Sequence, residues 1–251
     1  MVQNSFYCKS PFINLYDRPS SNSKIGSQML YGEKFKVIKK EKKYFKIRTK
    51  YDNYIGYIKP RKFLSKFVAT HKVGVLKSKI YKCPKDLKKF KTKSYLSFSS
   101  KIQVFKKKKN FIMFDNNKWL KAKDVKQINQ KDKNILRMLK LFLHCKYKWG
   151  GKSYNGIDCS ALIQLFYKFN NKFFPRDTVD QIKIKKGLKK VRKFKNGDII
   201  YWKGHVAICI NTKQLIHAYG PRKKVLIMDI QKTIRLIKKT ANLEIKKIFP
   251  I

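Results

Sequence analysis

The stretch YKWGGKSYNGIDCSALIQLFYKFN, residues 147–170, decides the fold of the C-terminal half of the chain. A glycine-containing loop leads into an apolar segment from Ala161 to Phe169 that is predicted to be helical, with Cys159 at its start. A cysteine at a helix N-terminus lies at the positive end of the helix dipole, near backbone N–H groups that favour a thiolate and stabilise an oxyanion. Cys159 is therefore a candidate nucleophile, although a lone cysteine there is more often a small buried residue.

The sequence on either side of this stretch predicts one further helix and then strands. Residues 132–145, DKNILRMLKLFLHC, have helical periodicity with Asp132 near the start. Asn170, Asn171 and Pro175 are expected to end the second helix. The strands are expected in DIIYW (198–202), HVAICI (205–210), QLIHAY (214–219) and KVLIMDI (224–230). Helices followed by an antiparallel sheet predict an α+β domain over residues 130–251.

Two histidines in the predicted strands could act as the base for a cysteine nucleophile and as the residue that orients this base. His205 begins one predicted strand, and His217 follows twelve residues later on the neighbouring strand. A thiol needs a base to take its proton, and the base needs a third group to hold its ring. Either histidine alone is more often a hydrogen-bonded core residue, but the joint placement with Cys159 favours a catalytic set.

The N-terminal half contains an internal repeat. Residues 32–47, GEKFKVIKKEKKYFKI, align without a gap with residues 99–114, SSKIQVFKKKKNFIMF, and LYDRP (15–19) corresponds to IYKCP (80–84). Each copy alternates apolar and polar residues around a lysine-rich turn, which predicts a small antiparallel barrel. The pattern resembles the bacterial Src-homology-three-like barrels that flank cell-wall enzymes. We expect one barrel over residues 8–66 and a second, degenerate one over residues 70–127.

The C-terminal motifs resemble the NlpC family (NlpC/P60 superfamily) of papain-like cell-wall cysteine peptidases. The nucleophile motif is followed in the family's order by FPRDTVDQ (174–181), GDIIYW (197–202), GHVAI (204–208) and LIHA (215–218). The resemblance implies that Cys159 is the nucleophile, His205 the general base and His217 the residue that orients it. It also implies that the Tyr147 hydroxyl lies near the oxyanion.

Further roles follow from the same resemblance. Asp158 and Ser160, which flank the nucleophile, are expected to help bind the substrate. Ala161 replaces the family's commoner glycine after Ser160, and alanine is a better helix former, so no loss of activity is expected.

The implied substrate is a peptidoglycan stem peptide, cut between γ-D-glutamate and the diamino acid. Barrels before the catalytic domain point to recycling enzymes that accept short peptides with a free N-terminal L-alanine. A free amine needs an acidic partner, and Glu33 and Asp158 are the candidates, with Tyr57 lining the same wall. An ordinary turn carboxylate and a barrel-core tyrosine are the alternatives for Glu33 and Tyr57.

The composition excludes several classes of protein. With 43% hydrophobic and 14% aromatic residues, the chain can form cores. The net charge of +49 comes from 63 basic residues spread along the chain, mostly lysines, which favours solvated faces over a specific nucleic-acid reader. No secretory or membrane-spanning segment is recognised, so a cytoplasmic location is expected. The protein is also expected to be a monomer.

The five cysteines predict neither disulfides nor a metal site. Their number is odd and they form no CxxC pair. His144 and Cys145 lack ligand spacing for zinc, and no cofactor is expected.

Three other functions stay open at this point. The chain could be an exported wall hydrolase acting on intact peptidoglycan, an inactive wall-binding homologue, or an acyltransferase that uses the same thioester with another acceptor.

Overall fold

The chain divides into two units, which are described separately. The computed structural model describes residues 5–82, 91–184 and 193–250. The first unit consists of Met1–Lys131, Lys152–Tyr154 and Phe169–Asn171, and the second consists of Asp132–Gly151, Asn155–Lys168 and Lys172–Ile251.

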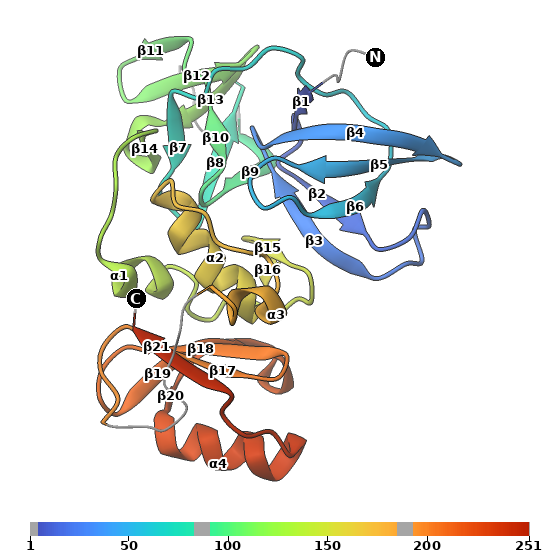
Figure 1. Cartoon of the computed structure of the whole chain (residues 1–251). Coiled ribbons are helices and arrows are strands. Elements are labelled where there is room, and N and C mark those ends of the chain that lie inside the picture. The colour runs from blue at the N-terminus through green and yellow to red at the C-terminus, as the bar shows by residue number, and fades with distance from the viewer. Residues whose placement is uncertain (1–4, 83–90, 185–192, 251) are drawn as a thin grey trace. The chain divides into compact units, whose positions relative to one another are not determined.

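The first unit begins with a six-stranded antiparallel sheet (Figure 1). Its strands are β1 (Ser5–Tyr7), β2 (Phe12–Tyr16), β3 (Ile25–Leu30), β4 (Lys34–Glu41), β5 (Tyr44–Thr49) and β6 (Ile55–Ile58), in the order β1-β4-β5-β6-β2-β3. Alternate side chains point inward and form a core of Cys8, Ile13, Leu15, Met29, Phe35, Ile47 and Ile58. Phe35 and Phe63 pack edge to face in this core, with ring centroids 4.9 Å apart.

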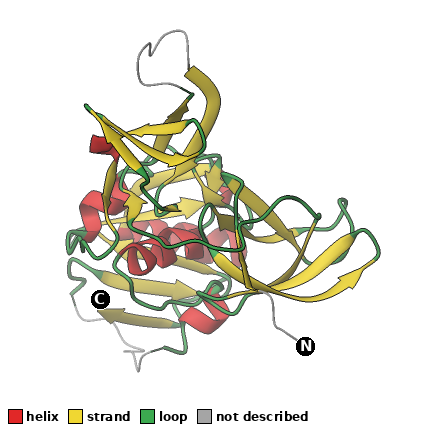
Figure 2. Ribbon diagram, turned by 90° about the horizontal axis from the view of Figure 1, so that it is seen from above, coloured by secondary structure: helices red, strands yellow, loops and turns green. Residues whose placement is uncertain are grey.

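The second set of strands in this unit repeats that order. It comprises β7 (His71–Val73), β8 (Lys77–Tyr81), β9 (Lys91–Ser97), β10 (Lys101–Ile102), β11 (Lys106–Lys108), β12 (Phe111–Asp115), β13 (Lys118–Lys121), the 3-10 turn η1 (Ala122–Asp124) and β14 (Val125–Gln127). The order β11-β12-β13-β8-β9 parallels β4-β5-β6-β2-β3, and β10 pairs with β7 as β4 pairs with β1. β4 of the first copy therefore corresponds to β10 and β11 of the second. Figure 2 colours the strands of the protein yellow and its helices red.

Backbone dihedral angles support the predicted repeat at single positions. Gly32 and Ser99 occupy equivalent places in the aligned stretches and have φ values of 74° and 66°. Lys42 and Lys109, in the two lysine-rich turns, have φ values of 54° and 49°. Non-glycine residues adopt the left-handed region rarely, so matched occurrences indicate the same turns in both copies. Cys83, in the segment IYKCP, lies outside the described residues.

The second unit contains a five-stranded antiparallel sheet. Its strands are β17 (Asp198–Trp202), β18 (His205–Cys209), β19 (Gln214–Tyr219), β20 (Lys224–Asp229) and β21 (Lys247–Pro250), in the order β20-β19-β18-β17-β21. The helices are α1 (Ile135–Lys140), α2 (Cys159–Phe169), α3 (Thr178–Gln181) and α4 (Ile230–Ala241), and the remaining short elements are β15 (Lys152–Ser153), β16 (Gly156–Ile157) and η2 (Gly220–Arg222). Figure 1 shows α2 and α4 on opposite faces of this sheet. The predicted α+β class is confirmed.

Two predictions about helices need correction. The helix expected over residues 132–145 is α1, which spans only Ile135–Lys140, because the chain turns after it and His144 adopts a left-handed φ of 65°. The amphipathic helix α4 lies where only strands were expected. Its Ile230 and Ile237 pack against the same core cluster as Ile200 and Trp202 of β17. The predicted α2 is confirmed, and Asn171 follows its end with a φ of 57°.

Not all lysines lie on solvated faces. Lys72 is 1% exposed, and its Nζ lies 4.4 Å from the ring centroid of Phe169 and donates to that residue's carbonyl oxygen at 2.5 Å. Burial lowers the pKa of Lys72 to about 8.

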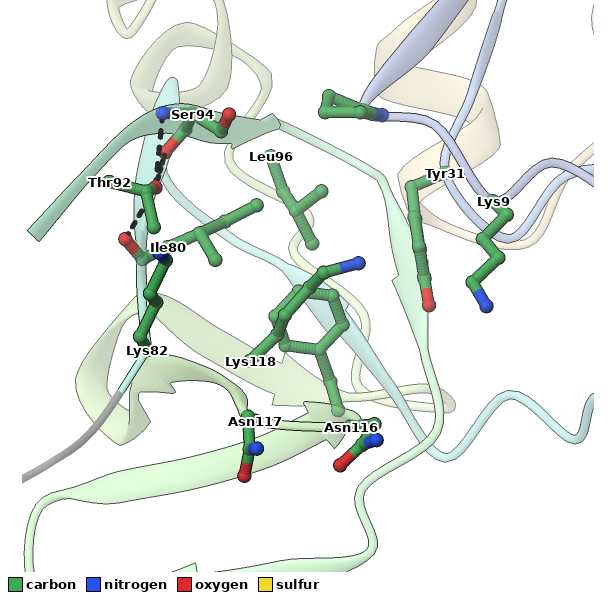
Figure 3. Close-up of a pocket in the computed structure, with 12 residues that line it drawn as sticks. Lys9, Tyr31, Ile80, Lys82, Thr92, Ser94, Leu96, Asn116, Asn117 and Lys118 are labelled. Carbon is green, nitrogen blue, oxygen red and sulfur yellow. Dashed lines mark hydrogen bonds between the residues drawn. The ribbon is translucent and has the colours of Figure 1, made fainter. Parts of the chain in front are cut away.

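A cavity of about 440 Å³ opens in the first unit (Figure 3). Its apolar lining comes from Tyr31, Ile80, Leu96 and Phe114, and lysines 9, 82 and 118 stand around it. None of the predicted site residues lines this cavity.

Within the described part of the chain, no helix has the length and apolar character that crossing a membrane requires. The expected cytoplasmic location and monomeric state stay predictions.

Candidate active site

Cys159 is held at the start of α2 by a tight turn and a cap. Gly156 has a φ of 142°, and a Cβ at this position would lie 2.6 Å from Cβ of Lys148, so only glycine fits there. Asp158 then caps the helix, because its Oδ1 accepts from the Ala161 backbone N–H at 2.9 Å. The Cys159 side chain is consequently fixed at the helix N-terminus, and the residue is only 6% exposed.

A buried ion pair fixes the residue before the nucleophile. Arg176 donates from Nη2 to Asp158 Oδ2 at 2.5 Å and from Nη1 to Asp158 Oδ1 at 3.0 Å. The same Nη1 donates to Ser160 Oγ at 2.8 Å, and Oδ2 also accepts from the Gly150 N–H at 3.0 Å. Asp158 and Ser160 thus contact Arg176 and each other inside the protein. Their predicted contact with substrate stays a prediction.

Gln181 ties the segment that carries Arg176 to the start of α2. Its Nε2 donates to the carbonyl oxygens of Ser160 at 3.0 Å and Pro175 at 2.9 Å, and its side chain is fully buried. Tyr201 donates to Gln181 Oε1 at 3.4 Å from the sheet. One amide therefore links helix, loop and sheet beside the nucleophile.

His205 and His217 form the predicted pair. Nε2 of His205 lies 2.9 Å from Nδ1 of His217, and Nε2 of His217 lies 3.3 Å from Sδ of Met228 on β20. His217 is fully buried and stacks on Tyr219, with ring centroids 4.7 Å apart.

For His205 to act as a base, these two contacts require one particular tautomer of each ring. His205 can accept a proton from a thiol only through Nδ1, because Nε2 faces His217. The neutral His205 must then carry its hydrogen on Nε2 and donate it to Nδ1 of His217. His217 in turn carries its hydrogen on Nε2, toward the weak acceptor Met228. The arrangement orients His205 as a base and stabilises it once it is protonated.

Backbone and side-chain groups place the Cys159 sulfur near the start of β18. The Val206 and Ser160 backbone N–H groups lie near enough to the sulfur to lower the pKa of the thiol, and Val206 directly follows His205. Tyr147 lies close enough to Cys159 and Asp158 to interact with them electrostatically. Burial raises the pKa of Tyr147 well above its usual range, so its hydroxyl keeps a proton that it can donate.

Burial of the Cys159 thiol opposes the effect of the helix N-terminus, which favours the thiolate. Burial raises the pKa of the Cys159 thiol to about 12, with a further contribution from the negative charge of Asp158, and this outweighs the Val206 and Ser160 N–H groups and Arg176. Burial also lowers the pKa of His205 to about 4. At neutral pH the free protein therefore holds a neutral thiol and a neutral imidazole, and the proton must move during the attack.

Two of the three residues predicted to surround the substrate amine, Glu33 and Tyr57, belong to the first unit, and the third, Asp158, belongs to the second. Glu33 is 4% exposed, and its Oε2 lies 3.6 Å from Nζ of the equally buried Lys152. Tyr57 donates to Glu41 Oε2 at 3.3 Å, with the Lys46 ammonium 5.8 Å from its ring centroid. Their role at the substrate amine stays a prediction.

Among the residues that the structure describes, no group of three or more histidine, cysteine or acidic side chains is placed to hold a metal ion. Cys145 is buried, and burial raises the pKa of its thiol.

Sequence reasoning missed three residues that build this site: Arg176, Gln181 and Met228. Arg176 and Gln181 lie within the quoted motif FPRDTVDQ, but nothing in a single sequence pairs them with Asp158 and Ser160. Met228 occupies a strand position that reads as ordinary core.

The buried histidines make the folded state sensitive to acid. Burial lowers the pKa of His205 from 6.5 to about 4 and that of His217 from 6.5 to about 3, with His205 as a second cause for His217. Below pH 6.5 the unfolded chain binds these protons first, so stability is lost as the pH falls. We expect a loss of about 2 kcal/mol for each histidine between pH 7 and pH 5. Urea unfolding at both pH values measures this loss of stability. The variant His217→Gln should lose less stability between the two pH values, because one buried histidine is gone. An equal loss in the variant would show that His217 does not contribute to the acid sensitivity.

His217 should act through its acceptor nitrogen. Glutamine can still accept the His205 Nε2 hydrogen, whereas leucine cannot, so His217→Leu is expected to lower kcat about 100-fold or more with KM little changed. His217→Gln should stay within about 10-fold of the unchanged protein. Steady-state kinetics on both variants test this, and equal losses would show that only the packing of His217 matters.

Comparison with known proteins agrees with the geometry in both units. A model of the NlpC/P60 family matches residues 144–241, and a model of the bacterial dipeptidyl-peptidase SH3 domain matches residues 15–62. The chain is 24% identical over 230 residues to dipeptidyl-peptidase 6 of Lysinibacillus sphaericus, covering 82% of this chain and 84% of that protein. It is 31% identical over 109 residues to γ-D-glutamyl-L-lysine dipeptidyl-peptidase of Bacillus subtilis, covering 40% and 36% of the two chains.

The fold has a solved counterpart. The structure of an NlpC/P60 family protein from Bacillus cereus superposes with a TM-score of 0.76 at 18% identity, covering 90% of this chain and 94% of that one. This likeness confirms the predicted arrangement of an all-β N-terminal region followed by an α+β domain.

Proposed function

We propose that this chain, whose residues 144–241 match the NlpC/P60 family, is a cysteine peptidase that hydrolyses the bond between γ-D-glutamate and the diamino acid in short peptidoglycan peptides with a free N-terminal L-alanine. The observation that carries the proposal is the pair His205–His217, whose facing ring nitrogens are 2.9 Å apart. His205 begins β18, and the next residue, Val206, lies near enough to Cys159 to lower the pKa of its thiol. The names of the two relatives, a dipeptidyl-peptidase and a γ-D-glutamyl-L-lysine dipeptidyl-peptidase, support the choice of bond.

The proposed reaction starts from the neutral pair. Nδ1 of His205 takes the thiol proton as the Cys159 sulfur attacks the γ-glutamyl carbonyl carbon, so that a carbon–sulfur bond forms. The carbon–nitrogen bond then breaks, and His205 returns the proton to the leaving amine. Water, activated by the same imidazole, attacks the thioester, releases the acyl group as a carboxylic acid and restores the thiol.

Two donors support the oxyanion in this scheme. The backbone N–H of Cys159 lies at the start of α2, where helix N–H groups have no partner within the helix. The Tyr147 hydroxyl, which stays protonated at neutral pH, is the second.

The two acidic candidates for binding the free amine already have partners within the protein. Asp158 is engaged by Arg176 and by two backbone N–H groups, which leaves Glu33 as the stronger of the two acidic candidates. Glu33 shares its carboxylate with Lys152, so an ammonium at Glu33 would join a buried pair rather than meet an isolated charge. Tyr57 would contribute an aromatic wall.

The test uses L-Ala-γ-D-Glu-diaminopimelate and its N-acetylated form, with products followed by mass spectrometry. We expect the unchanged protein to release free diaminopimelate from the first peptide and to spare the second, while Cys159→Ala releases none. Equal cleavage of both peptides would refute the amine requirement. Cleavage of neither would refute the proposed function.

A further inference from the structure

A cleft of about 530 Å³ adjoins the catalytic base in the second unit. Its walls are the turn of Lys203 and Gly204 between β17 and β18, the 3-10 turn η2, and the C-terminal half of α4 with Leu243. His205 and Tyr147 line the same cleft. The volume falls in the range of cavities that hold small ligands.

The position of His205 identifies the side of the substrate that enters this cleft. In the proposed reaction His205 gives its proton to the leaving amine, so the leaving residue must pass within hydrogen-bonding distance of the imidazole. The acyl group stays on the Cys159 sulfur. A cleft that His205 lines is therefore placed to hold the leaving residue.

The floor of the cleft is aliphatic. Leu236, Ile237 and Leu243 line it together with the ring of Tyr219, and Leu236 and Leu243 are only partly buried. Partly exposed aliphatic groups gain stability when an aliphatic chain covers them. The methylene chain of a diamino acid suits such a floor.

The rim of the cleft is cationic. Lys203 comes from the turn before β18, and Arg222 comes from η2. Within the residues that the structure describes, no aspartate or glutamate lines the cleft, and neither cation takes part in an ion pair. An arginine and a lysine that come from two different turns and line one cavity favour a carboxylate as its ligand.

We propose that this cleft is the subsite for the leaving residue and that Arg222 and Lys203 bind its free carboxylate. The inference rests on the proposed function and deepens it, because it assigns specificity for substrates whose diamino acid is the C-terminal residue. Peptides whose leaving residue carries no carboxylate are poorer substrates.

The experiment compares L-Ala-γ-D-Glu-L-Lys with its C-terminal amide. A charge-assisted hydrogen bond to the carboxylate should raise kcat/KM for the free acid about 10-fold or more over the amide. Arg222→Gln should remove most of this preference by slowing cleavage of the acid, while cleavage of the amide is unchanged. Lys213→Gln is the matched control, since it removes one exposed positive charge from a turn of the same unit outside the cleft.

A third peptide separates two sources of the carboxylate. The C-terminal amide of L-Ala-γ-D-Glu-diaminopimelate keeps a carboxylate on its side chain. Rapid, Arg222-dependent cleavage of this amide would show that the cleft also accepts a side-chain carboxylate and would support the inference. If acid and amide of the lysine peptide are cut equally in a Cys159-dependent reaction, the inference is wrong while the proposed function stands. Cleavage of no peptide would overturn both.

Discussion

Replacing Cys159 by alanine is expected to lower kcat on L-Ala-γ-D-Glu-diaminopimelate by about 10⁴-fold or more, because no other group can form the thioester. Cys159 is buried, and alanine leaves the helix cap at Asp158 in place, so the protein should still fold. Stability should fall by about 1 kcal/mol for the lost sulfur. Mass spectrometry of products and a thermal unfolding curve on the same sample measure both effects.

The same residue offers a second, independent measurement. With the pKa of Cys159 raised to about 12, the free protein holds almost no thiolate at pH 7, so iodoacetamide should label this thiol slowly. Labelling should speed up as the pH is raised, unlike that of a thiolate–imidazolium pair already formed at neutral pH. Rapid labelling of Cys159 at pH 6 to 7 would contradict the neutral resting pair. Persistent activity in Cys159→Ala would rule out covalent catalysis altogether.

Local patterns were sufficient to predict most of the fold. Short apolar runs located β17 to β20 within a residue or two. The runs are nearly continuous in β17, β18 and β19 because these strands are buried along almost their whole length. The repeat predicted two similar barrels, each with a lysine-rich turn. In the structure the two sets of strands share their order, and Lys42 and Lys109 in these turns both have a left-handed φ. α4 was missed because its run of lysines hid a narrow apolar face that contains Ile230, Thr233 and Ile237.

The sequence predicted which residues form the candidate catalytic set, but not their protonation states or their buried partners. Spacing and residue type located Cys159, His205 and His217. The protonation state of the thiol was not predictable, because burial, which outweighs the helix N-terminus, depends on packing from distant segments. The ion-pair partners of Asp158 and Glu33 were not predictable either. Arg176 and Lys152 are two of 63 basic residues, and nothing in the sequence distinguishes them as residues that become buried on folding.

The cleft proposed as the subsite for the leaving residue was not predictable from the sequence either. Its cationic rim is assembled from Lys203 and Arg222, which stand 19 positions apart in the sequence among many similar residues. Its floor belongs largely to α4, the helix that the pattern did not predict. Because the chain has so many basic residues, the sequence alone could not identify Lys203 and Arg222 as candidates for binding a carboxylate.

Arg176→Leu is expected to lower the free energy of unfolding by about 3 to 5 kcal/mol. The change leaves the carboxylate of Asp158 buried without its bidentate partner, and an uncompensated buried charge is costly. Activity should fall as well, by about 100-fold, because Asp158 sets the first turn of α2 and a shift of about 1 Å at Cys159 misaligns the attack. Urea unfolding and steady-state kinetics on the purified variant measure these effects.

The charge can be separated from the packing by a second change. In Arg176→Leu combined with Asp158→Asn, no charge is left uncompensated, and the asparagine can still cap α2 through the Ala161 N–H. The double variant should therefore regain a substantial part of the lost stability, and the coupling between the two positions should reach about 2 kcal/mol or more. Arg176→Lys keeps the charge but loses the paired donors, so its stability should lie between those of Arg176→Leu and the unchanged protein. If all three variants were destabilised equally, the contribution of Arg176 would be packing of its side chain, and the ion pair would have no special part in holding the nucleophile.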